Sequence, residues 1–142
     1  MITAIADANM DSIPMIVVTG QVGVNAIGTD AFQEADIVGA TYPVAKHSYL
    51  VTDAQDIPRV LSEAHYIARS GRPGPVVVDL TKTAQNGTMY YSWPQRMILP
   101  GYNPTTERMA ACSDDAARLF QHAFRPVLYV AVAQCVPTPV PR

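Results

Sequence analysis

The chain alternates helix-like segments with short apolar runs, and this rhythm limits the folds that it can adopt. Met15-Ile16-Val17-Val18 and Pro75-Val76-Val77-Val78-Asp79-Leu80 are rich in β-branched residues, as in strands that are buried on both faces. Residues 46–51 predict a further strand, and residues 57–70 predict a helix between these last two strands. The order helix, strand, helix, strand is typical of an α/β fold with a parallel sheet and crossover connections.

The helix over residues 57–70 has the clearest signals. Asp56 is its predicted N-cap, Pro58 suits its first turn, and Gly71 follows its end. Its apolar residues recur at steps of three and four, which places them on one face: Ile57, Val60, Leu61, Ala64 and Ala68.

Two further helices are predicted in the first half of the chain. The chain opens in helix-forming sequence, and this helix should end near Asp11 because Pro14 disfavours helical geometry in the residue before it. We also expect a short helix to begin within residues 30–34.

After Lys82 the character of the sequence changes. Residues 83–106 contain several prolines, Asn86-Gly87 and four aromatic residues, which predicts a long surface connection. A helix over residues 110–122 and a strand over 126–132 look like the beginning of a second α/β domain, and the proline-rich residues 133–142 should be extended. We therefore expect the chain to be a fragment of a larger protein.

Composition excludes several classes of protein. Ten basic residues against twelve acidic ones leave no basic surface for nucleic acid. No run approaches the ~18 apolar residues of a membrane span, and no signal peptide is visible, so a cytoplasmic location is expected. Cys112 and Cys135 form no Cys-x-x-Cys pair, and no metal site is predicted.

Several polar residues fall where predicted strands end. Gln21, Gln33 and Lys82 lie at or beyond the carboxyl ends of strands, where open parallel sheets bind ligands. The amide of Gln33 can donate and accept hydrogen bonds, and Arg72 and Lys82 can hold an anionic substrate or a phosphate. The residues alone also allow a structural interpretation, in which Gln33 caps a turn, Arg72 pairs locally and Lys82 is solvated.

A family resemblance sharpens this interpretation. The string Ile27-Gly28-Thr29-Asp30-Ala31-Phe32-Gln33-Glu34 resembles the catalytic large subunits of acetolactate synthase (acetohydroxyacid synthase), a thiamine-diphosphate-dependent family. The similarity extends from about residue 3 through Lys46-His47 to the segment Ser70-Gly71-Arg72-Pro73-Gly74-Pro75 and on to Lys82. Weaker similarity continues to residue 130.

The resemblance implies a domain organisation and an activity. Residues 1–82 would form the C-terminal half of a three-layer, parallel-sheet pyrimidine-binding domain, 83–106 a linker, and 107–132 the beginning of a central FAD-binding domain. Residues 133–142 match nothing in the family. The family uses thiamine diphosphate, magnesium and FAD to condense two pyruvates, or pyruvate and 2-oxobutyrate, with decarboxylation, in branched-chain amino-acid biosynthesis. The implied partners are further catalytic subunits in a homodimer or tetramer, with a regulatory small subunit as a further candidate.

The resemblance also implies roles for residues near the substrate. Gln33 is similar to the glutamine that lies near thiamine diphosphate and the substrate, and Phe32 to its neighbour in the substrate channel. Lys46 and Lys82 look like the lysines at the mouth of that channel.

Two residues are similar to family members that face FAD, namely Ser12 and Arg72. The glutamate that activates thiamine diphosphate lies upstream of the matching region, so no catalytic residue is assigned to this chain. The motif that binds magnesium and the diphosphate lies downstream. The resemblance therefore implies that the chain alone is inactive.

Two other interpretations stay open. The chain could be a non-catalytic, truncated scaffold or an interaction fragment. It could also come from a related carboligase such as glyoxylate carboligase, although the Gly28-Thr29-Asp30-Ala31-Phe32-Gln33-Glu34 string argues against this.

Overall fold

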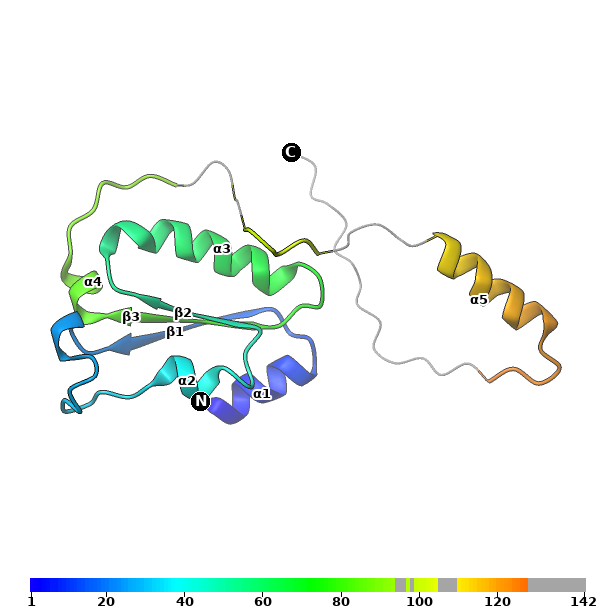
Figure 1. The fold of residues 1–142 in the computed structure, drawn as a ribbon, viewed down its shortest axis with the longest axis horizontal. Coiled ribbons are helices and arrows are strands. Elements are labelled where there is room, and N and C mark those ends of the chain that lie inside the picture. The colour runs from blue at the N-terminus through cyan, green and yellow to red at the C-terminus, as the bar shows by residue number, and fades with distance from the viewer. Residues whose placement is uncertain (94–96, 98, 105–109, 128–142) are drawn as a thin grey trace.

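A computed structural model of the chain describes residues 1–93, 97, 99–104 and 110–127 (Figure 1). Its three strands form one sheet: β1 (Met15–Gln21), β2 (His47–Val51) and β3 (Pro75–Thr81). The sheet has the order β1-β3-β2, and β3 pairs in parallel with both of its neighbours. The predicted parallel α/β sheet is confirmed.

Helices cover both faces of this sheet. α3 (Ile57–Arg69) packs on one face, and α1 (Ile2–Met10) and α2 (Ile37–Thr41) pack on the other (Figure 1). The result is the three-layer arrangement that the resemblance implies. The other described elements are three short helices and one later helix: η1 (Val24–Ala26), η2 (Ala54–Asp56), α4 (Lys82–Asn86) and α5 (Ala110–His122).

The core forms around the central strand. Val76, Val77 and Val78 of β3 are fully buried, as the apolar run predicts for a strand that is covered on both faces. Val76 and Val78 belong to the core cluster with the apolar face of α3, whose buried members include Val60, Ala64, Ile67 and Ala68. On the opposite side, Ile5 and Ala8 are the buried residues of α1.

The prediction of a short helix that begins within residues 30–34 is wrong. Asp30 and Gln33 have φ values of 55° and 66°, whereas an α-helix needs φ near −60°. This segment forms turns, and helix α2 begins only at Ile37, where the Asp36 side chain accepts a hydrogen bond of 2.7 Å from the Gly39 N–H. A later acidic residue thus provides the helix cap.

The long connection predicted after Lys82 begins with helix α4. Thr81 caps this helix, since its Oγ1 accepts from the Ala84 N–H at 3.2 Å, and Ala84 is buried. The segment 99–104 returns to the end of α3, where the Tyr102 hydroxyl donates to the Ser70 carbonyl at 3.1 Å.

Helix α5 has the bounds that the sequence predicts, and its Leu119 and Phe120 side chains are exposed. Residues 126–127 are irregular, while the rest of the strand predicted over 126–132 and the extended tail 133–142 lie outside the described residues. Within the described part of the chain, no helix has the length and apolar character to cross a membrane.

Candidate functional site

The six predicted site residues divide between the two ends of the sheet. One group follows the carboxyl ends of β1 and β3, and the other precedes the strands at their amino ends. At ~3.3 Å per residue, the seven residues of β3 separate the two groups by roughly 20 Å. The first group is Phe32, Gln33 and Lys82, and the second is Ser12, Lys46 and Arg72.

After the neighbouring strands β1 and β3, the chain continues toward opposite faces of the sheet. The segment after β1 leads to α2 on one face (Figure 1). The segment after β3 enters α4, which contacts η2 at the start of α3, on the opposite face. In open α/β sheets, ligands bind beside the carboxyl ends of the strands at such a switch point.

A buried carboxylate joins the two strands at this end. Asp79 of β3 is 1% exposed, and its two oxygens accept from Thr19 Oγ1 at 2.7 Å and from Gln21 Nε2 at 3.2 Å. Gln21 Nε2 also donates to the carbonyl of Ala35 at 2.5 Å, so it holds the far end of the loop against the sheet. The signal for this network is an acidic residue within a buried apolar run, because buried acidic side chains need partners.

Glu34 closes the turn in which Phe32 and Gln33 lie. Its Oε1 accepts from the Gly28 N–H, and its Oε2 accepts from the Ala31 N–H at 3.0 Å. These hydrogen bonds, that of Gly28 first, lower the pKa of Glu34 below its ordinary value. The turn thus has a negatively charged group bound to its own backbone.

This turn presents Phe32 and Gln33 to solvent. Phe32 is 89% exposed, and Gln33 is exposed with its backbone in the left-handed region. Lys82, the first residue of α4, is exposed at the same end of the sheet. Thr83 Oγ1 accepts from the Val24 N–H at 3.1 Å and so joins α4 to the loop after β1.

At the amino end, Arg72 closes the end of α1. Its Nη2 donates to the carbonyls of Asn9 and Met10 at 3.0 and 3.1 Å, and its Nε donates to Ser12 Oγ at 3.1 Å. The structure therefore brings together the two residues that the resemblance assigns to FAD. A guanidinium at a helix C-terminus also interacts favourably with the helix dipole.

Lys46 closes the end of α3 in the same way. Its Nζ donates to the carbonyls of Ile67 and Ser70 and lies 5.6 Å from the centre of the Tyr102 ring. Lys46 is only partly exposed and holds the 99–104 segment against α3. These contacts give Lys46 a structural role, which the sequence did not predict.

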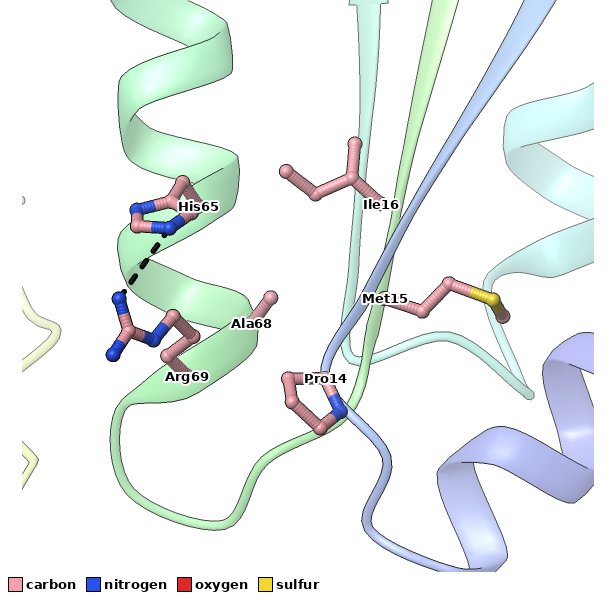
Figure 2. A pocket seen from close by; sticks show the side chains of 6 residues that line it. All are labelled: Pro14, Met15, Ile16, His65, Ala68 and Arg69. Atoms are coloured by element: carbon pink, nitrogen blue, oxygen red, sulfur yellow. Dashed lines mark hydrogen bonds between the residues drawn. The ribbon is translucent and has the colours of Figure 1, made fainter. Parts of the chain in front are cut away.

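A groove also lies at the amino end, between β1 and α3 (Figure 2). It has a volume of about 310 Å³ and is lined by Pro14, Met15, Ile16, His65, Ala68 and Arg69. Figure 2 shows Ile16 pointing toward α3 and His65 beside Arg69, with 3.4 Å between His65 Nε2 and Arg69 Nη1. None of the six predicted site residues lines this groove.

The three implied cofactors place different demands on these residues. Within the described ranges, no group of three histidine, cysteine or acidic side chains converges on one point. The exposed amide of Gln33 suits the polar groups of a pyrimidine or a 2-oxo acid, whereas this strand end lacks a glycine-rich phosphate loop. At the other end, the guanidinium of Arg72 suits the diphosphate of FAD.

Known proteins are similar to nearly the whole chain. No protein-family model matches it. It is 55% identical over 130 residues to an acetolactate synthase of Mycobacterium bovis, and 52% identical over 130 residues to the acetolactate synthase large subunit of Corynebacterium glutamicum. These matches cover 92% of this chain and 21% of each relative.

A third relative gives the same result. The large subunit of acetolactate synthase isozyme 3 from Escherichia coli is 50% identical over 131 residues, which are 91% of this chain and 23% of that protein. The chain thus spans about a fifth of the length of these relatives. Its sequence is homologous to one segment of the acetolactate synthase large subunits.

Proposed function

We propose that this chain supplies one part of the active site of an acetolactate synthase, namely the turn at the carboxyl end of its parallel sheet. The observation that carries the proposal is the position of Phe32 and Gln33, which lie exposed on a braced turn beside the β1 and β3 switch point. Identity above 50% to acetolactate synthases supports the reaction type.

In this proposal, the whole enzyme condenses two pyruvates, or pyruvate and 2-oxobutyrate, with loss of carbon dioxide. When bound, thiamine diphosphate supplies the nucleophilic carbon and the electron sink for decarboxylation. The Gln33 amide orients the 2-oxo acid by donating to a carbonyl or carboxylate oxygen. Phe32 covers the reacting groups and keeps water away, and Lys82 attracts the anionic substrate.

The amino end of the sheet serves FAD in the same proposal. Arg72 already uses Nε and Nη2 on Ser12 and the end of α1, so the contact to an anionic part of FAD is made through Nη1. For Lys46 the proposed channel contact competes with two carbonyls and the Tyr102 ring. Lys82 is therefore the stronger candidate for a lysine that meets substrate.

The proposal extends to domains, partners and location. Residues 1–82 form the pyrimidine-binding part, 83–106 the linker, and 107–132 the start of the FAD-binding domain. The name of the Escherichia coli relative, an isozyme's large subunit, supports assembly with a small subunit. A homodimer or tetramer, a role in branched-chain amino-acid biosynthesis and a cytoplasmic location remain predictions.

A segment exchange tests the proposal. The matching segment of the Corynebacterium glutamicum large subunit is replaced by this chain's residues, and acetolactate is measured with pyruvate, thiamine diphosphate, magnesium and FAD. We expect an active hybrid that loses about 100-fold in kcat/KM on Gln33→Ala, because an orienting oxyanion donor contributes a factor of that order. Gln55→Ala, at an exposed position of η2, is the matched control and should leave kcat/KM unchanged.

The isolated chain gives the complementary result. It should form no acetolactate under the same conditions, since neither the activating glutamate nor the diphosphate site is present in the matching region. A hybrid that folds and binds FAD but makes no acetolactate would favour the non-catalytic scaffold. A hybrid that condenses glyoxylate in preference to pyruvate would favour glyoxylate carboligase.

A further inference from the structure

We propose that Glu34 is the positioning residue for Phe32 and Gln33, because its carboxylate holds their turn closed by binding the backbone N–H groups of Gly28 and Ala31. This inference rests on the proposed function, in which Phe32 and Gln33 meet the substrate. It assigns to Glu34 a role that acts through its neighbours and not on the substrate itself.

The two carboxylate oxygens of Glu34 reach two separate points of the loop. Oε1 binds the Gly28 N–H, six residues earlier in the chain, and Oε2 binds the Ala31 N–H, three residues earlier, at 3.0 Å. Each of the two backbone donors therefore has its own carboxylate oxygen as acceptor. Glutamine retains one acceptor oxygen, aspartate is one methylene shorter, and alanine has no acceptor.

The backbone of the turn needs such a brace. Gly28, Asp30 and Gln33 have φ values of 82°, 55° and 66°, and the last two are non-glycine residues in the left-handed region. Conformations of this kind persist only where surrounding contacts hold them, and they cluster at functional sites. Phe32, which lies between Asp30 and Gln33, is 89% exposed and so gains little packing of its own.

A second brace fixes the other side of the turn. Gln21 Nε2 donates to the Ala35 carbonyl at 2.5 Å and is itself bound to the buried Asp79. Gln33 and Glu34 therefore lie between the Ala31 and Ala35 anchors. Loss of the Glu34 carboxylate should release the turn locally and leave the sheet intact.

Limited proteolysis of the full 142-residue chain tests this step. Chymotrypsin cleaves after exposed aromatic residues, and the rate of cleavage follows the population of the open segment. In Glu34→Ala we expect cleavage after Phe32, resolved by mass spectrometry, to be at least about tenfold faster than in the parent chain. Glu34→Gln should give an intermediate rate, and Glu34→Asp should not restore the parent rate.

The same digest contains its own controls. Tyr90 and Phe124 are 92% and 96% exposed, and cleavage after them should be unchanged. Tyr49 lies in β2, so faster cleavage after it would report global unfolding. A rate after Phe32 that is unchanged in Glu34→Ala, or that rises only together with the rate after Tyr49, would overturn the role of Glu34.

An NMR titration provides a readout that a general loss of stability would not change. The amide protons of Gly28 and Ala31 should shift together as the pH falls, with a midpoint below the ordinary glutamate value of 4.5. Glu34→Gln should abolish this titration, whereas Asp36→Asn, which alters the α2 cap, should preserve it. Amide protons that do not titrate, or that still titrate in Glu34→Gln, would contradict the contact.

Kinetics of the hybrid enzyme connect the turn to its function. Glu34→Ala should raise KM for pyruvate and lower kcat in the same direction as Gln33→Ala, with a smaller effect. If Glu34→Ala opens the turn but both variants keep full activity, the proposed function fails and the turn is structural only. If Gln33→Ala loses activity but Glu34→Ala neither opens the turn nor changes the kinetics, the positioning role of Glu34 fails and the proposed function stands.

Discussion

Arg72 Nε lies 3.1 Å from Ser12 Oγ and donates a hydrogen bond to it across 60 residues of sequence. Ser12 has a φ of 58°, so the chain turns sharply at this residue between α1 and β1. Arg72 also binds two carbonyls at the end of α1. The loop before β3 is therefore attached to the loop before β1.

Arg72→Leu should lower the free energy of unfolding by about 1 kcal/mol, because three hydrogen bonds of an exposed guanidinium are lost. Urea denaturation measures this change. Arg118→Leu, at an exposed position of helix α5, is the matched control and should have a smaller effect. A double-mutant cycle with Ser12→Ala should show coupling, and strictly additive effects would contradict the contact.

The two predicted channel lysines should behave differently on substitution. Lys46→Met removes a charged donor from two carbonyls at the end of α3 and should cost about 1–2 kcal/mol. Lys82→Met changes an exposed side chain and should cost less than about 0.5 kcal/mol. Urea midpoints of the two variants make the comparison, and equal losses would show that Lys46 is not bound as described.

Because of Tyr49, we expect the free energy of unfolding to fall at alkaline pH. Burial, followed by the 3.0 Å hydrogen bond to Glu63, raises the pKa of Tyr49 above its ordinary value of 10.0. Because the folded pKa is the higher one, this stabilisation is complete below pH 10 and is lost as the pH rises above it.

Urea midpoints between pH 8 and pH 11.5 test this dependence. The parent chain and Tyr90→Phe should both lose stability above about pH 10, whereas the curve of Tyr49→Phe should be flatter. Tyr90 is the control because its side chain is 92% exposed. Parallel curves for Tyr49→Phe and Tyr90→Phe would contradict the shift.

Gly87 has no room for a side chain. A Cβ on this residue would lie 2.8 Å from the Cβ of Ala54, since α4 packs closely on η2. Gly87→Ala should therefore cost about 1–3 kcal/mol through overcrowding. Ala54→Gly removes the opposing methyl group, so the double variant should be more stable than the sum of the two single effects predicts. A Gly87→Ala variant as stable as the parent chain would contradict this packing.

The sequence was sufficient to predict the elements that depend on local signals. The α3 helix was predicted over residues 57–70 and runs from Ile57 to Arg69, because its Pro58 start, apolar face and Gly71 end agree. The valine run of β3 predicted a strand buried on both faces for the same reason. The prediction of a helix that begins within residues 30–34 was wrong, because the Glu34 side chain binds the backbone N–H groups of Gly28 and Ala31 and holds the segment in a turn. No local sequence pattern indicates these side-chain contacts.

The candidate site was predictable only in part. The positions of Phe32, Gln33 and Lys82 at strand ends follow from the order of the elements. The contacts of Lys46 and Arg72 depend on helix ends that are distant in sequence, so residue type alone could not distinguish a ligand contact from a helix cap. The sheet order β1-β3-β2 likewise depends on long-range pairing.

That sheet order has a consequence for how the chain forms its structure. Among the strands that the structure describes, β1 and β2 each pair with β3 and not with each other, and β3 is the last of the three to be synthesised. Until residues 75–81 leave the ribosome, neither β1 nor β2 can form its ladder with β3. Such non-local parallel pairing forms slowly and leaves strand edges open to other chains in the meantime. The edges of β1 and β2 that face β3 are therefore open during the interval between the synthesis of β1 and that of β3.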